Sequence, residues 1–162
     1  MRKRLMTPTL EPVQSQDENW LDLEHAAVVE ASSEETDFPV EAALVFGEAQ
    51  GWRAAGTGPQ TIRLLFDQPQ RIKQIALVFE EDETIRTQEF VLRWSPASQV
   101  WLREIVRQQW NFSPPATVRE VEVYRVDLSD VIVLELTIVP DISGGAARAS
   151  LKSMRLSPGS MD

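Results

Sequence analysis

The sequence predicts an all-β domain, a sandwich or a barrel, and three observations support this class. From residue 20 to residue 156 the chain is a series of short segments rich in Val, Ile, Leu, Phe and Thr. Pro, Gly, Asp or Ser bounds each segment at a spacing typical of strands. Apolar and polar residues alternate within several segments, as expected for strands with one buried face.

The first elements are short. His25, the single histidine of the chain, lies at the start of the first predicted core strand. Residues 40–46 follow Pro39 and precede Gly47, a pattern that predicts one helical turn.

The middle of the chain predicts three strands, residues 61–66, 72–79 and 90–94. Gln68-Pro69-Gln70 is expected to end the first strand, and the acidic run 80–83 the second. Ser95-Pro96 ends the third.

The remaining elements begin with an ambiguous segment, residues 101–110, whose apolar spacing also suits a helix. Its length and its neighbours favour a strand. Residues 118–128, 132–139 and 150–156 predict three more strands. We expect the core to contain Ile62, Leu64, Ile75, Leu77, Phe90, Leu92, Leu134, Leu136 and Leu151. The domain is predicted to span residues 20–156, between flexible tails at residues 1–19 and 157–162.

Composition excludes several classes of function. With no cysteine the chain has neither disulfides nor thiolate metal sites, and 16 basic against 25 acidic residues give a net charge of −9. Nucleic acid is therefore an unfavourable partner. No signal peptide and no apolar run of membrane-spanning length is evident, so we expect a cytoplasmic protein that does not bind membranes.

The inventory of catalytic residues is small. Cysteine is absent, His25 is the single histidine, and no serine lies in a Gly-x-Ser-x-Gly setting. His25 is more simply interpreted as structural or exposed. We expect no enzyme activity, while a carboxylate-dependent glycoside hydrolase stays open as a third hypothesis.

Aromatic residues beside turns are the best candidates for binding. Trp52-Arg53 follows a loop that contains glycine, and Trp110-Asn111 leads into Ser113-Pro114-Pro115. An exposed ring with nearby planar polar groups suits sugars and peptide side chains. The alternative, that Trp52 and Trp110 are core residues at strand ends, carries equal weight.

The order of these segments resembles discoidin-like domains, the galactose-binding-like jelly rolls. The resemblance covers nearly all of residues 24–156, and its order carries more information than any single motif. The matching segments are Ala31-Ser32-Ser33-Glu34, Gly51-Trp52-Arg53-Ala54, Gln60-Thr61-Ile62-Arg63-Leu64, Pro69-Gln70-Arg71-Ile72, Phe90-Val91-Leu92-Arg93-Trp94-Ser95 and residues 149–156.

The resemblance implies a jelly-roll β-sandwich of about eight strands and a non-catalytic binding module. Carbohydrate is the implied ligand, and a protein partner is the alternative. Many members carry a calcium loop where this chain has residues 46–52, and a glutamate ligand where it has Ser153. We therefore expect no cofactor and no calcium. The loops at one end of the barrel are expected to form a shallow site from Glu48, Trp52, Arg53, Arg86, Trp110 and Asn111.

Overall fold

The computed structural model describes residues 19–45, 50–99 and 101–159. These residues form two one-turn helices and eight strands. The helices are α1 (Leu23–Ala26) and α2 (Glu41–Leu44), and the strands are β1 (Ala27–Ala31), β2 (Trp52–Arg53), β3 (Gln60–Glu80), β4 (Arg86–Pro96), β5 (Arg103–Phe112), β6 (Arg119–Val139), β7 (Ser150–Leu151) and β8 (Ser153–Ser157).

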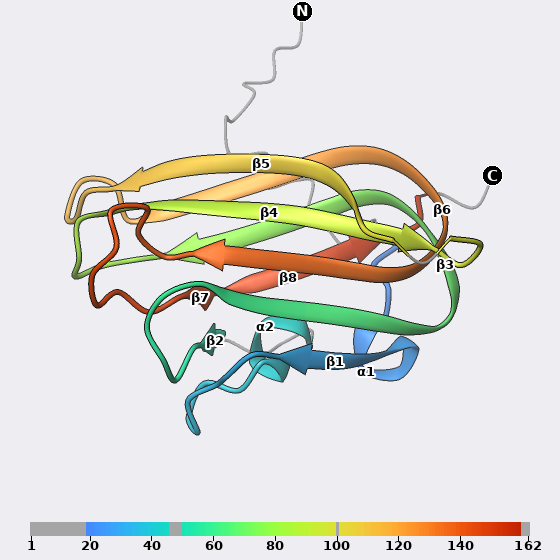
Figure 1. Ribbon diagram of the computed structural model, residues 1–162, viewed down its shortest axis with the longest axis horizontal. Helices are drawn as coiled ribbons and strands as arrows, with labels where there is room; N and C mark the ends of the chain where they lie inside the picture. Colours follow the sequence, from blue (N-terminus) through green and yellow to red (C-terminus); the bar gives the residue numbers. More distant parts are fainter. Residues whose placement is uncertain (1–18, 46–49, 100, 160–162) are drawn as a thin grey trace, which may run out of the picture.

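Two long strands, β3 and β6, contribute to both layers of the molecule because each bends near its middle (Figure 1). The first half of β3 pairs with β1 and with the second half of β6, which in turn pairs with β4, and β4 pairs with β5. The second half of β3 pairs with β8 and with the first half of β6. All these pairs are antiparallel, and together they form a jelly-roll sandwich, as predicted.

The bends account for the main difference from the predicted strands. The expected pairs 61–66 with 72–79 and 118–128 with 132–139 are each one continuous strand. Register shifts in the β3–β6 ladder fall between Leu65 and Gln74, around Pro69, which has no N–H to donate. Asp130, at the corresponding bend of β6, adopts a φ of 57°. The predicted turn residues therefore bend these strands without ending them.

The core lies between the two layers and contains all nine residues that the sequence assigned to it. None of the nine is more than 1% exposed. The rings of Phe79 on β3 and Phe90 on β4 stack across the layers with their centroids 5.2 Å apart. This contact joins the second half of β3 to the opposite sheet.

The shorter elements agree with the predictions in part. Residues 103–112 form the strand β5, so the helical alternative for this segment is wrong. The predicted helical turn is α2, although Phe46 lies outside the described residues. His25 lies in α1, where a strand was expected to begin, because α1 precedes β1. The predicted final strand is divided into β7 and β8.

The last strand ends near residue 156, the predicted C-terminal boundary of the domain. The last strand includes Ser157, which pairs with Gln74 and is 1% exposed. It therefore extends one residue past the predicted boundary. Residues 1–18 of the predicted N-terminal tail and residues 160–162 of the predicted C-terminal tail lie outside the described residues. Within the described ranges, neither helix has the length or the apolar character to cross a membrane.

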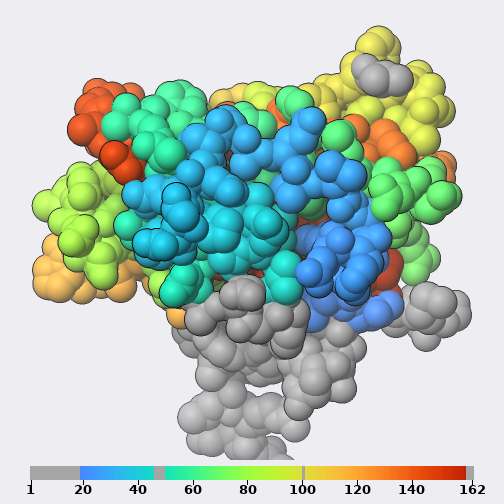
Figure 2. Space-filling model, turned by 90° about the horizontal axis from the view of Figure 1, so that it is seen from below, coloured from blue at the N-terminus to red at the C-terminus, as the bar shows by residue number. Residues whose placement is uncertain are grey.

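Connecting segments gather at one end of the sandwich. The turn between β3 and β4, the loop between β5 and β6 and the loop between β6 and β7 lie together at the left of Figure 1, near β2. Figure 2 shows the same segments at the left edge of a second face, while the turn between β4 and β5 lies at the opposite end. We call the first of these two ends the loop end.

Candidate functional site

A cleft with a volume of about 650 Å³ opens at the loop end. The strands β2 and β7 contribute its floor, and the turn 80–84 forms one wall. Phe38, Gln50, residues 118–119, the loop 146–148 and Lys152 also line it. The cleft therefore collects side chains from segments that are about a hundred residues apart in the sequence.

The floor of the cleft is anchored by Trp52. Its indole is 1% exposed, and its Nε1–H donates a hydrogen bond of 2.9 Å to the carbonyl oxygen of Ser33. Across the two-stranded ribbon Trp52 pairs with Leu151, which is also buried. The structure thus gives Trp52 a core position, so its ring does not present an open face on which a ligand could stack.

Beside the floor, two arginines share one carboxylate. Arg148 donates from Nη1 to Oε1 of Glu35 at 3.0 Å, and Nε of Arg53 lies 3.5 Å from Oε2 of Glu35. The guanidinium of Arg53 also lies over the ring of Phe38, with Cζ 4.4 Å from the ring centroid. This packing fixes the orientation of the Arg53 guanidinium at the cleft.

Another part of the lining is the acidic turn 80–84, which Arg86 holds in place. Nε of Arg86 donates to Oε1 of Glu81 at 2.7 Å, and the backbone N–H groups of Glu83 and Thr84 donate to Oε2. Burial by itself would raise the pKa of Glu81. These three hydrogen bonds together hold its pKa below the usual value, so Glu81 stays ionised.

Arg86 is itself buried, with 3% of its surface exposed. Its Nη1 donates to the carbonyl oxygen of Pro140 at 2.8 Å, and the guanidinium lies over the ring of Phe112. Arg86 therefore positions the wall of the cleft from behind and does not line it. Sequence reasoning expected this arginine to face a ligand, and it could not foresee burial that depends on β4, β5 and the β6–β7 loop packing together.

The other predicted site residues occupy different positions at this end. Arg53 lines the cleft, whereas Asn111 pairs with Thr87 on the β4–β5 ladder and its Oδ1 accepts a hydrogen bond from the Thr87 hydroxyl. Trp110 packs half-buried against the core, and its Nε1 is buried without a hydrogen-bond partner among the described residues. Glu48 lies outside the described residues.

Several cleft residues were not predicted. Phe38, Arg148 and the exposed Asp82 and Glu83 line the cleft, but no local pattern marks the first two. The acidic run 80–83 is visible in the sequence, where it predicts only the end of a strand. Only the folded structure shows that it lines the same cleft as Arg53 and Arg148.

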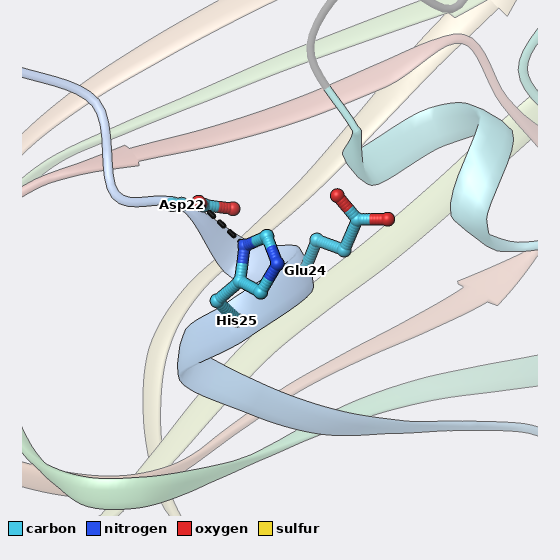
Figure 3. A group of neighbouring side chains, drawn as sticks. All are labelled: Asp22, Glu24 and His25. Atoms are coloured by element: carbon cyan, nitrogen blue, oxygen red, sulfur yellow. Dashed lines mark hydrogen bonds and ion pairs between the residues drawn. The ribbon is translucent and has the colours of Figure 1, made fainter.

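Two further groups of ionisable side chains lie away from the cleft. Asp22, Glu24 and His25 gather at α1, and Figure 3 shows the imidazole of His25 turned toward Asp22. His25 Nδ1 lies 2.7 Å from Asp22 Oδ2, and this hydrogen bond raises the pKa of His25 and lowers that of Asp22. All three side chains are exposed, and hydrogen bonding within the group explains their arrangement.

The second group contains Glu120 of β6, which is 0% exposed. Burial, together with the neighbouring Glu122 carboxyl, raises the pKa of Glu120 to about 9. Nε2 of Gln88 donates to Oε1 of Glu120 at 3.2 Å. The carboxyl that stays protonated at neutral pH therefore lies in the interior of the sandwich and outside the lining of the cleft.

Comparison with known proteins gives matches in structure. No protein-family model matches the chain, and no curated protein matches its sequence. A family 32 carbohydrate-binding module of NanJ from Clostridium perfringens, in complex with galactose, superimposes with a TM-score of 0.64 at 14% identity, over 86% of this chain and 98% of that one.

Two other solved structures show the same likeness. The family 32 module of AlyQ, in complex with 4,5-unsaturated mannuronic acid, has a TM-score of 0.58 at 16% identity, over 81% of this chain and 94% of that one. An F5/8 type C domain from Bacteroides fragilis has a TM-score of 0.61 at 10% identity, over 88% of this chain and 97% of that one. The strand order, the two-layer sandwich and these superpositions together establish that this chain has the galactose-binding-like jelly-roll fold of carbohydrate-binding modules and discoidin-like domains.

Proposed function

We propose that this chain is a carbohydrate-binding module that holds a glycan in the cleft at the loop end. The observation that carries the proposal is the cleft itself, because its volume of about 650 Å³ lies within the usual range for small-molecule sites. It lies at the loop end of a fold whose solved examples include modules in complex with galactose and with an unsaturated mannuronic acid.

The chemistry of the lining supports a hydroxylated ligand. Arg53, Arg119 and Arg148 offer planar donors, and the carboxylates of Asp82 and Glu83 offer acceptors. Each sugar hydroxyl both donates and accepts hydrogen bonds, so it matches a lining that offers both donors and acceptors. The half-buried ring of Phe38 supplies apolar surface beside them.

The role that we propose is binding without catalysis. A glycosidase of the usual kind needs one carboxyl that is protonated near neutral pH beside the scissile bond. Glu81, at the cleft, is held ionised, and the protonated Glu120 lies in the core. This separation argues against the hydrolase hypothesis.

A glycan array followed by calorimetry on the retained glycans tests the proposal. Ala146 is exposed and lines the cleft, so Ala146→Leu should obstruct the cleft and weaken glycan binding at least about tenfold, or ~1.4 kcal/mol. Ala97→Leu is the matched control, since Ala97 is exposed in the turn between β4 and β5 at the opposite end. It should leave the affinity unchanged.

Two results would count against the proposal. Silence of the whole array would exclude glycan binding and favour the alternative of a protein partner. Equal loss in both leucine variants would place the glycan somewhere other than the cleft. Cytoplasmic location and the absence of membrane and nucleic-acid partners stay predictions from the sequence.

A further inference from the structure

One group of ion-paired side chains at the cleft contains more positive than negative charges. Glu35 is the common partner of Arg53 and Arg148, so two positive charges share one negative charge. Glu80 likewise lies 3.6 Å from Nη1 of Arg119 and 3.7 Å from Nζ of Lys152. At Glu35, within the described residues, the two arginines therefore outnumber their carboxylate partner.

The Arg53–Glu35–Arg148 group has the shorter contacts of these two groups. Its shortest contact is 3.0 Å, and the ring of Phe38 supports the Arg53 guanidinium. Arg53 and Arg148 have side chains that are 50% and 47% exposed, so both guanidinium groups reach the open part of the cleft. Each presents further N–H donors beyond those directed at Glu35.

A carboxylate fits this arrangement better than a hydroxyl does. Guanidinium groups bind carboxylates through paired, charge-assisted hydrogen bonds, which are about twice as strong as neutral ones. A second carboxylate placed between Arg53 and Arg148 would also balance the excess positive charge that Glu35 leaves.

Other charges determine which way such a ligand would lie. Asp82 and Glu83, on the turn 80–84, are exposed and take part in no ion pair within the described ranges, so they repel an anion. The net charge of −9 also repels anions at long range, but physiological salt screens exposed charges beyond about 8 Å. The ligand's carboxylate would therefore lie on the arginine side, and its hydroxyls would face the acidic turn.

We propose that the cleft selects acidic sugars, with a uronate carboxylate bound between Arg53 and Arg148. The inference rests on the proposed function and specifies the class of glycan.

Matched pairs of oligosaccharides test this selectivity directly. Oligogalacturonate and oligogalactose, oligoglucuronate and oligoglucose, and oligomannuronate and oligomannose differ within each pair by the carboxylate that replaces a hydroxymethyl group. In calorimetry, the uronate of whichever pair binds should bind about tenfold more tightly than its neutral partner, or ~1.4 kcal/mol. This ratio should fall as salt is added.

A substitution tests whether the arginines of the cleft cause the preference for uronates. Arg148→Gln should bring the ratio of the two affinities close to one. Arg103→Gln removes the same charge at the start of β5, at the opposite end of the sandwich, and should keep the ratio of the parent protein. Because both sugars are measured on the same protein, a smaller folded fraction would not change the ratio.

The outcomes separate this inference from the function on which it rests. Equal affinity for both members of every bound pair would overturn the uronate preference and leave carbohydrate binding standing. The preference would also be overturned if Arg148→Gln and Arg103→Gln lowered the ratio alike, since that result would indicate long-range charge. Failure of all six sugars to bind, while other glycans of the array are retained, would overturn the uronate inference alone, since silence of the whole array is the result that contradicts the proposed function.

Discussion

Three tryptophans, Trp52, Trp101 and Trp110, lie in three different environments that the sequence does not distinguish. Trp52 is 1% exposed in the core, Trp101 is 62% exposed in the turn between β4 and β5, and Trp110 is half-buried under the edge of the sandwich. The position of each ring follows from its neighbours in the sheet. In the sequence, a core position and a ligand-facing position had equal weight for Trp52. Its burial against β7 and its hydrogen bond to Ser33 identify the core position.

Replacement of Trp52 should therefore destabilise the fold. We expect Trp52→Ala to lower the free energy of unfolding by about 3–5 kcal/mol, because a large buried side chain and its hydrogen bond to Ser33 are lost. Chemical denaturation followed by circular dichroism measures the change. Trp101→Ala, at an exposed site, should stay within about 0.5 kcal/mol of the parent protein. Equal stability of the two variants would contradict the core position of Trp52.

The two arginines that the sequence grouped together also have separate roles. Arg53 reaches the cleft, and Arg86 lies behind it with its donors directed at Glu81, Gln88 and Pro140. A guanidinium is rarely buried unless its donors are satisfied. The sequence shows the charge of each arginine but does not show which one finds such partners.

Glu120 makes the stability of the protein depend on pH. Its pKa is about 9 in the folded protein and about 4.3 in an unfolded chain, so the fold favours the protonated form. Stability is then fully present below about pH 4.3 and declines as the pH rises toward about 9. The charged or titratable groups near this carboxyl are Glu122 and Tyr124 on β6 and Arg86 on β4.

An uncharged replacement should remove this decline. Glu120→Gln should be more stable than the parent protein at neutral pH, and the difference should grow between about pH 5 and pH 9. Urea denaturation at several pH values measures it. Glu83→Gln, in the exposed part of the turn 80–84, serves as the control and should follow the parent curve. A difference that shrinks as the pH rises would show that the carboxyl is ionised in the fold.

At the scale of the elements, the bends of β3 and β6 set the architecture. Each of these two strands has 21 residues, begins in one layer and ends in the other. Each strand therefore contributes to both layers. Pro69 and the turn-forming residues around it were sufficient to predict an interruption. Whether the interruption ends a strand or bends it depends on whether the partner strand bends at the same level, and a single strand does not contain that information.

The ribbon of β2 and β7 forms the floor of the cleft and depends on Gly51. This residue has a φ of 78°, and a Cβ there would lie 2.7 Å from the carbonyl oxygen of Leu151 and 2.9 Å from Cα of Lys152. Both contacts are with backbone atoms of the facing segment, and backbone atoms cannot rotate away as the end of a side chain can. The close approach of the two strands therefore requires glycine.

Alanine substitutions at two glycines separate this contact from backbone conformation. Gly58 has a similar φ of 81°, but a Cβ there would meet nothing within 4 Å. Gly51→Ala should cost about 1–3 kcal/mol more in free energy of unfolding than Gly58→Ala, because it adds a clash to the same conformational penalty. Thermal denaturation of both variants measures the difference. Equal costs would show that the floor tolerates a methyl group.

For the molecule as a whole, the jelly-roll connections bring the candidate site together. The turn 80–84, the loop between β5 and β6 and the loop between β6 and β7 leave the sandwich at the same end, so their side chains converge. The resemblance to discoidin-like domains predicts a shallow site formed by the loops at one end of the barrel. It could not predict Arg148 and Phe38, because their place in the cleft depends on long-range packing.

The sequence by itself determined the strand class, the nine core residues and the order of the elements, because alternation and turn residues are local consequences of the pleated backbone. The tertiary structure alone decided that β3 and β6 continue through their bends, that Trp52 and Arg86 are buried, and that Arg53 and Arg148 share Glu35. These features arise from contacts between residues that are distant along the chain. Burial and ion pairing depend on which side chains meet in space, and that is settled only when the two layers pack together.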